Sequence, residues 1–165
     1  MKQILILIFC ISQNVAKAQI VDSTFDFGEC NDIMKEYDEF DQTTTYYTPL
    51  SKNCHLTKVI DKKKVTYYLS LNAEGSKLNS GEIGVKIILS NDQIISFPNE
   101  RIKVDVPHNG SGWNYSTFIT ILPDKLQLFK KHKIMRWKLY IYSESQSDYE
   151  AEEFRKLVNC LAWVK

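Results

Sequence analysis

The chain has 165 residues, of which 44% are hydrophobic and 25% are charged, and its formal net charge is +1. This length is enough for one domain with a substantial hydrophobic core. The near-neutral charge provides no bulk electrostatic attraction for nucleic acid or for an acidic membrane, so we expect no nucleic-acid partner.

The first 18 residues have the pattern of a secretory signal peptide. Lys2 gives a charged start, residues 4–11 form an uninterrupted apolar run, and Ala16-Lys17-Ala18 has small residues where a signal peptidase reads. The apolar run is far shorter than the roughly 20 residues that cross a bilayer. We therefore expect cleavage before Gln19 and an exported mature chain, residues 19–165. This chain would form one domain in the periplasm or outside the cell, without a transmembrane segment.

Cys10 raises the alternative of a lipid-anchored protein. The bulky Phe9 precedes it, where lipid attachment favours a small side chain, so cleavage is the preferred interpretation and lipidation stays an open alternative. Cleavage would remove Lys2 and Lys17 and no acidic residue, which changes the formal net charge to −1. The argument against a nucleic-acid partner therefore holds for the mature chain as well.

Residues 32–41 combine clustered acidic residues with three apolar side chains. Met34, Tyr37 and Phe40 are three apart and would share one face of a short helix; a loop along a sheet is an equal alternative. The carboxylates could hold Ca²⁺, but the segment lacks the spacing and the glycine of a calcium loop. We expect a solvated surface here.

From Thr43 onward, short segments of β-strand character follow one another. They are rich in β-branched and aromatic residues or alternate between apolar and polar side chains. Turn signals separate them, among them the charged run Asp61–Lys64, the link Asn91-Asp92, and two Gly-containing loops at 72–81 and 107–114. The predicted strands are 43–48, 55–60, 65–71, 83–90, 93–97, 101–106, 115–122 and 134–142.

The last of these strands has the clearest alternation. Met135, Trp137, Leu139 and Ile141 would point one way, and Arg136 and Lys138 would point the other way. This period of two over nine residues predicts a strand with one buried face and one exposed face.

Two helices complete the prediction. Pro123 suits the first position of a short helix whose Leu126 and Phe129 would face inward. Residues 148–162 have an apolar stripe at helical spacing, and Ser147 and Glu150 have the spacing of a capping box. We therefore predict a mainly β fold, an antiparallel β-sandwich-like domain with a short helix and a C-terminal helix.

The cysteines of the mature chain are Cys30, Cys54 and Cys160, so at most one intramolecular disulfide forms and one thiol is left over. Three pairings are possible, and the sequence does not choose among them. Cys160 lies at the edge of the helical stripe, where burial is expected. The polar surroundings of Cys30 and the turn before Cys54 suggest that both are exposed.

Sequence motifs for catalysis and metal binding are missing. The chain has no Gly-x-Ser-x-Gly, Cys-x-x-Cys or His-x-x-x-His motif, so we expect no catalytic site, metal or cofactor. Cys54 and His55 are adjacent, but neighbours in a strand point to opposite faces and do not form a catalytic pair.

Exposed aromatic and basic residues are the candidate ligand contacts. Tyr68, Trp113 and Tyr115 belong to adjacent pairs or lie near a Gly-rich loop, and exposed Tyr and Trp rings can stack on sugars or anchor a protein. Arg136 and Lys138 could bind anionic ligands or glycans. The alternatives are that Trp113 covers the sheet edge and that the basic residues protect strand edges from aggregation.

Four segments resemble small exported, functionally uncharacterised β-rich proteins of Bacteroidetes. They are Asp38-Glu39-Phe40-Asp41 followed by Thr45 and Tyr46, the pair Leu122-Pro123-Asp124-Lys125-Leu126 and Lys133-Ile134-Met135-Arg136-Trp137-Lys138-Leu139-Tyr140-Ile141, and the end Val158-Asn159-Cys160-Leu161. The resemblance covers roughly residues 38–48 and 122–161. It implies export and a β-rich fold, and it assigns no functional residue.

The functional expectation is an exported, non-catalytic binding domain for an unknown protein or glycan at the cell envelope. One alternative is an assembly subunit that pairs through strand edges. The other is a small hydrolase with two carboxyl groups of raised pKa in one cleft.

Overall fold

The computed structural model describes residues 30–49, 53–106 and 112–164, and the expected signal peptide lies outside them. Within these residues the chain forms two helices and ten strands. The helices are α1 (Pro123–Lys131) and α2 (Asp148–Trp163). The strands are β1 (Met34–Asp38), β2 (Thr43–Tyr47), β3 (Cys54–Asp61), β4 (Lys64–Gly75), β5 (Ile83–Leu89), β6 (Ile94–Arg101), β7 (Lys103–Asp105), β8 (Trp113–Ile121), β9 (Ile134–Leu139) and β10 (Tyr142–Ser145).

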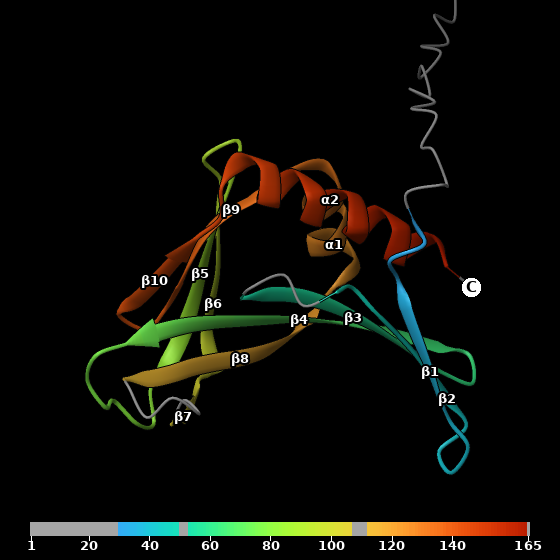
Figure 1. Ribbon diagram of the computed structural model, residues 1–165, viewed down its shortest axis with the longest axis horizontal. Helices are drawn as coiled ribbons and strands as arrows, with labels where there is room; N and C mark the ends of the chain where they lie inside the picture. Colours follow the sequence, from blue (N-terminus) through green and yellow to red (C-terminus); the bar gives the residue numbers. More distant parts are fainter. Residues whose placement is uncertain (1–29, 50–52, 107–111, 165) are drawn as a thin grey trace, which may run out of the picture.

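The strands form two antiparallel sheets. The six-stranded sheet has the order β1-β2-β3-β4-β8-β7, and the four-stranded sheet has the order β10-β9-β5-β6. In Figure 1 the four-stranded sheet stands across one end of the six-stranded sheet, and the two helices lie over the space between them. The predicted class, a mainly β antiparallel fold with a short helix and a C-terminal helix, is confirmed.

Alternation along the strands places one row of side chains from each sheet in a shared core. Trp137 of β9 links the two sheets directly, because its indole Nε1 donates a hydrogen bond of 2.8 Å to the backbone oxygen of Asn72 in β4. The buried core residues of the strands are Tyr46, Cys54, Leu56, Leu69, Leu71, Ala73, Val85, Ile87, Leu89, Ile95, Tyr115, Ile119, Ile121, Ile134, Trp137 and Leu139.

Helix α2 closes the core as its apolar stripe predicts. Ala151, Phe154, Val158 and Leu161 are buried, while Leu157 is half-buried. The predicted capping box is present: the Ser147 side chain accepts a hydrogen bond from the Glu150 amide, and the Glu150 carboxylate accepts one from the Ser147 amide. No helix in the described part of the chain is long and apolar enough to span a membrane.

The C-terminal end of α2 is stabilised from the six-stranded sheet. Lys58 of β3 is 5% exposed, and its ammonium group donates hydrogen bonds to the backbone oxygens of Leu161 and Val164. It also lies 5.7 Å from the ring centre of Tyr67. The last turn of α2 has no basic residue of its own. Lys58 therefore supplies the positive charge that the negative end of the helix dipole favours.

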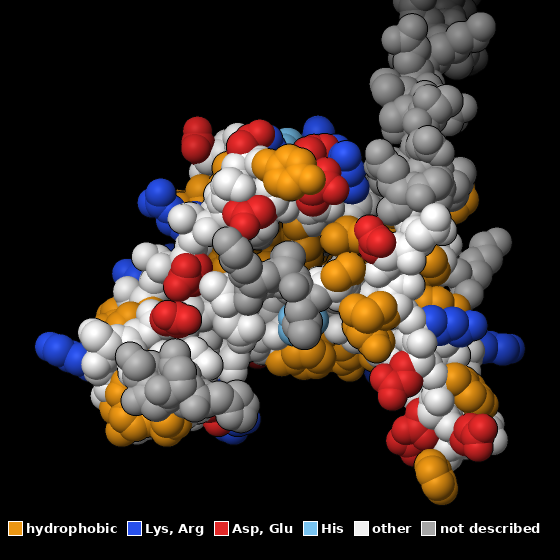
Figure 2. All heavy atoms as spheres, in the orientation of Figure 1, with side chains coloured by type: hydrophobic (Ala, Val, Ile, Leu, Met, Phe, Trp, Pro, Cys, Tyr) orange, Lys and Arg blue, Asp and Glu red, His pale blue; other side chains and the backbone are white. Residues whose placement is uncertain are grey.

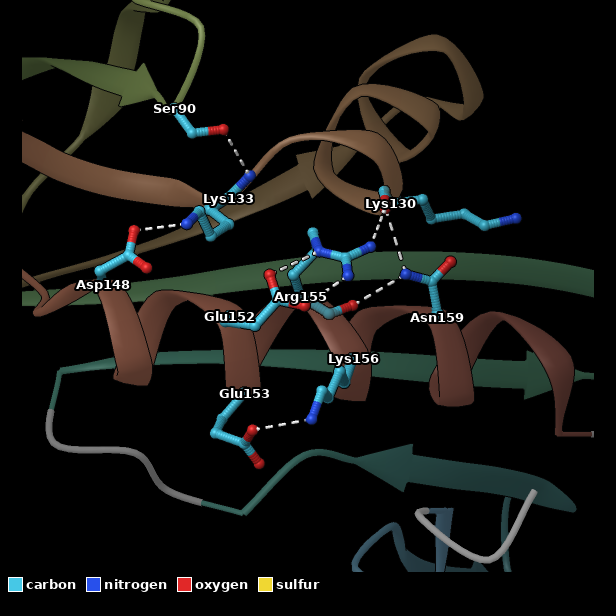
Figure 3. A network of polar contacts seen from close by, with 9 residues as sticks. All are labelled: Ser90, Lys130, Lys133, Asp148, Glu152, Glu153, Arg155, Lys156 and Asn159. Atoms are coloured by element: carbon cyan, nitrogen blue, oxygen red, sulfur yellow. Dashed lines mark hydrogen bonds and ion pairs between the residues drawn. The ribbon is translucent and has the colours of Figure 1, made fainter. Parts of the chain in front are cut away.

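A polar network joins α2 to the end of α1 (Figure 3). Arg155 and Asn159 of α2 both donate hydrogen bonds to the backbone oxygen of Lys130, one of the last-turn carbonyls that α1 cannot satisfy internally. Arg155 also pairs with Glu152, and this contact lowers the pKa of the Glu152 carboxyl group. These side-chain to backbone contacts thus fix the end of α1 to α2.

Several predicted boundaries are wrong. Residues 34–38 form the edge strand β1, where a short helix or a loop was expected, and β4 extends to Gly75 into the predicted loop. β6 continues through Pro98, where a break was expected. Pro98 lies at the register shift between β5 and β6, between the pairs formed by Phe97 and Arg101. The predicted strand 134–142 is divided by a tight turn in which Tyr140 has φ 55°, so that β10 folds back on β9 and Ile141 is exposed.

Gly75 is required by close packing at the end of β4. A Cβ atom at this position would lie 2.6 Å from Cε2 of Tyr115 and 2.7 Å from Cε1 of Tyr142, and both rings are held by hydrogen bonds. We expect Gly75→Ala to lower the free energy of unfolding by about 1–3 kcal/mol, as overpacking does. Urea denaturation checks this. The control Ser76→Ala, at the exposed neighbouring residue, should stay within about 0.5 kcal/mol of the unsubstituted protein; equal effects would contradict the packing argument.

Candidate functional site

The outer face of the six-stranded sheet is the clearest candidate surface. Side chains that alternate with the core residues of β3, β4 and β8 point away from the core. We call this surface the open face. Its central residues are His55, Thr57, Val59, Thr66, Tyr68, Ser70, Asn72, Ser116, Phe118 and Thr120, and the strand ends add Asp61, Lys64, Glu74 and Asn114.

The centre of the open face contains no Asp, Glu, Lys or Arg; the charged residues of this face, Asp61, Lys64 and Glu74, lie at the ends of β3 and β4. His55 does not add a charge at neutral pH, because partial burial lowers its pKa from an ordinary value of 6.5. A solvent-exposed sheet face normally carries charged residues, which keep it soluble and unpaired. The centre of this face, where hydroxyl, amide and aromatic groups lie beside His55 and Val59, is therefore unusual for bare surface and typical of a ligand-contacting surface.

Two aromatic rings form the centre of the open face. Tyr68 pairs with Thr120 and Ser70 pairs with Phe118 across β4 and β8, so the Tyr68 and Phe118 rings are diagonal neighbours. They stack with 4.8 Å between ring centres and 15° between ring planes. Phe118 is nevertheless 54% exposed. The stacked pair thus presents an apolar surface to solvent, bordered by the hydroxyl groups of Thr57, Ser70 and Thr120.

The surface around this pair is hollowed. In Figure 2 hydrophobic side chains gather along the underside of the molecule, below the six-stranded sheet, between the projecting β1–β2 end and the opposite end. A recess of about 540 Å³ adjoins Phe118 at the β7 side; its lining includes Ser70, Ser116, Arg101 and Lys103. The open face could therefore receive an extended ligand along the sheet.

The structure separates the five residues predicted to contact a ligand. Tyr68 lies on the open face, while Arg136 and Lys138 are exposed on the outer face of the four-stranded sheet. Trp113 and Tyr115 belong to the core side of β8, because they alternate with its outward residues. No single site contains all five.

Tyr115 has a structural role in place of the predicted surface role. Its ring is fully buried, 4.4 Å from the ring centre of Tyr142, so it is closed to a stacking ligand in this conformation. Its hydroxyl group donates a hydrogen bond to the backbone oxygen of Lys77 and accepts one from the Asn79 amide. Tyr115 therefore holds the loop between β4 and β5. Trp113 is half-buried and packs against the core beside it.

Phe118 and His55 are open-face residues that the sequence interpretation missed. The alternation of β8 places Phe118 opposite to Tyr115 and could have identified it as exposed. Its stacking on Tyr68 depends on the pairing of β4 with β8, which are about 50 residues apart in the chain. Alternation within single strands does not predict that pairing.

Catalytic groups do not gather in the described residues. The carboxyl groups with a shifted pKa are Asp124 and Glu152, and both pKa values are lowered, by Lys125 and by Arg155. The hydrolase alternative requires raised values. Burial raises the pKa of the Cys54 thiol, which disfavours the reactive thiolate. No group of three or more His, Cys, Asp or Glu side chains in the described part of the chain could hold a metal ion.

The disulfide joins Cys30 and Cys160. It connects the segment before β1 to the last turns of α2, across 130 residues of sequence. Cys54 is 1% exposed inside the six-stranded sheet, so the expectation that it is exposed is wrong. The turn before Cys54 suggested exposure, but Cys54 is already the first residue of β3 and its side chain faces the core.

The edge strand β1 carries its own protection against pairing with another chain. All five of its residues are exposed, and Lys35, Glu36 and Asp38 place charges along it. Such charges discourage edge-to-edge association. The assembly alternative thus gains no support from this edge.

No protein-family model, curated protein or solved structure matches the chain. The resemblance to exported Bacteroidetes proteins therefore stays a prediction, and function has to be argued from the site itself.

Proposed function

We propose that this chain is an exported, non-catalytic binding domain of the cell envelope or the secreted fraction, and that its ligand is an uncharged glycan bound on the open face. The observation that carries the proposal is the exposed Tyr68–Phe118 stack at the uncharged centre of the open face. Trp113 and Tyr115 contribute by fixing the end of β8 and its neighbouring loop, not by direct contact.

The chemistry of the open face fits a sugar chain. Aromatic rings bind the apolar C–H faces of sugar rings, which supplies affinity without charge. Hydroxyl and amide groups both donate and accept hydrogen bonds, as sugar hydroxyl groups require, and Thr57, Ser70, Asn72 and Thr120 provide them around the stack.

Affinity gel electrophoresis with neutral polysaccharides tests the proposal. We expect at least one of laminarin, mannan, xylan and dextran to retard the protein. Tyr68→Ala and Phe118→Ala should each weaken the apparent affinity about tenfold or more, because each removes half of the stacked surface. The polysaccharide should keep its length after incubation, since the proposal includes no bond cleavage.

Tyr149→Ala is the matched control. Tyr149 is 74% exposed on α2, away from the six-stranded sheet's outer face, so its loss should leave retardation unchanged. Thermal unfolding of each variant separates lost binding from lost folding. The proposal is wrong if none of the four polysaccharides retards the protein, or if folded Tyr68→Ala and Phe118→Ala variants are retarded as strongly as the unsubstituted protein.

A further inference from the structure

The outer face of the four-stranded sheet carries a cluster of basic residues at its centre. Lys86 of β5 and Lys138 of β9 are directly opposite each other, and Arg136 follows two residues from Lys138 on the same face. All three side chains are exposed. In Figure 1 this sheet forms the left side of the molecule, and Figure 2 shows Lys and Arg side chains projecting outward there.

Like charges directly opposite on neighbouring strands are destabilising. None of these three residues forms an ion pair within the described part of the chain. The outward positions around them hold Ser96, Ser143 and Ser145 and the aliphatic residues Ile88 and Ile94, but no carboxylate. The positive charges of Lys86, Arg136 and Lys138 are thus uncompensated, although an acidic residue at a neighbouring outward position could pair with them.

Protection of a strand edge does not explain this arrangement. β5 and β9 are the two central strands of the sheet, and its edges are β6 and β10. The interpretation of Arg136 and Lys138 as edge-protecting residues therefore fails for these positions. General solubility does not require two lysines to face each other either, since charges of both signs serve it.

A recess lies beside the lysine pair. It has a volume of about 310 Å³ and is lined by residues that include Gly84, Ser96 and Tyr140 besides Lys86 and Lys138. Gly84 has φ 102° at the irregularity of β5, and its carbonyl accepts a hydrogen bond from the Tyr140 amide, which fixes the turn at one side of the recess. The two ammonium groups thus flank a shaped hollow with a nearby serine hydroxyl group.

We propose that this face, made of Lys86, Arg136, Lys138 and Ser96, is a binding site for a phosphate or sulfate group. One anionic group placed between the two ammonium groups would replace their repulsion with two attractive contacts. Arg136 would add the forked donors that suit phosphate and sulfate oxygens. The site lies on a different sheet from the open face and does not depend on the glycan proposal.

Amide chemical shifts during a titration with inorganic phosphate, at constant ionic strength against chloride, test the proposal. We expect the shifts to concentrate in β5, β9 and the turn at Tyr140. The double variant Lys86→Gln/Lys138→Gln should weaken the apparent affinity at least tenfold. The control Lys63→Gln/Lys64→Gln removes the same charge from the exposed turn between β3 and β4 and from the first residue of β4, and it should change the affinity less than twofold.

Thermal unfolding gives a second readout, which basic residues that serve only solubility would not produce. In chloride buffer of low ionic strength, the Lys86→Gln/Lys138→Gln variant should have a higher Tm than the unsubstituted protein, because a repulsion is removed. Phosphate should raise the Tm of the unsubstituted protein and leave that of the variant unchanged. Equal phosphate effects on both proteins, or shifts spread evenly over all surface lysines, would overturn the proposal.

Sedimentation with phosphatidylglycerol vesicles distinguishes the two sources of such a group. Co-sedimentation that the double variant loses supports the site and assigns its ligand to lipid headgroups. Phosphate-induced shifts without co-sedimentation support the site and assign its ligand to soluble phosphate or sulfate groups. Co-sedimentation that the double variant retains, together with an absence of phosphate shifts at β5 and β9, overturns it.

Discussion

Replacement of Cys30 and Cys160 by alanine is expected to lower the free energy of unfolding by about 4–5 kcal/mol. The disulfide spans 130 residues, which is most of the domain, and a cross-link over so long a loop strongly restricts the unfolded chain. It also ties the segment before β1 to buried Cys160 in α2. Urea denaturation of the oxidised protein and of the variant measures the difference.

The single variants provide the control. Because either substitution alone removes the disulfide, Cys30→Ala and Cys160→Ala should each lose nearly as much stability as the double variant. Independent contributions would instead give each single variant about half of that loss. Alkylation of the oxidised protein in denaturant should modify one of the three cysteines present in residues 30–164, which is Cys54, and reduction should expose all three. A double variant within about 1 kcal/mol of the unsubstituted protein would contradict the pairing.

Trp137→Ala is expected to destabilise the fold by about 3–5 kcal/mol. The side chain is 2% exposed, and it is among the largest fully buried groups in the described chain. Its indole N–H bonds to the Asn72 carbonyl, so the substitution removes both core volume and a direct link between the two sheets. It also leaves a carbonyl group without its partner in the core.

Two further substitutions separate these contributions. Trp137→Phe keeps most of the apolar volume and loses the hydrogen bond, so we expect a smaller loss of about 1–3 kcal/mol. Tyr149→Ala removes an aromatic ring that is 74% exposed and should change stability by less than about 0.5 kcal/mol. If Trp137→Ala were no more destabilising than Tyr149→Ala in urea denaturation, the two-sheet core described above would be wrong.

The sequence was sufficient for the parts of the fold that local periodicity determines. The strands at the centre of each sheet, the Pro123 helix start and the Ser147–Glu150 capping box all follow from the spacing of apolar residues and from capping chemistry. These signals depend only on residues within a few positions of each other.

The missed features depend on distant contacts. β1 forms because its residues pair with β2, although the acidic composition and the spacing of Met34, Tyr37 and Phe40 suggested otherwise. Met135 was expected in the core, but a bulge opposite Ile88 and Leu89 shifts the register, so Ile134 is buried in its place. The turn at Tyr140 requires a positive φ angle at a non-glycine residue, which is uncommon and leaves little trace in the sequence.

The sequence predicted individual residues of the candidate surfaces, but it did not predict how these residues group. Tyr68, Arg136 and Lys138 were correctly expected to point away from the core, since alternation fixes the direction of each side chain. Their grouping into two separate surfaces comes from strand order, which places Phe118 beside Tyr68 and Lys86 opposite Lys138. Strand order is a property of the whole sheet, and no single segment encodes it.

The most direct test of the proposed function is an amide chemical-shift map of the protein with an oligosaccharide from whichever neutral polysaccharide retards it. A glycan on the open face predicts the largest shifts at outward residues of β3, β4 and β8, among them His55, Tyr68 and Phe118. Shifts confined to Trp113 and the loop between β4 and β5, with the open face unchanged, would contradict this account of the protein.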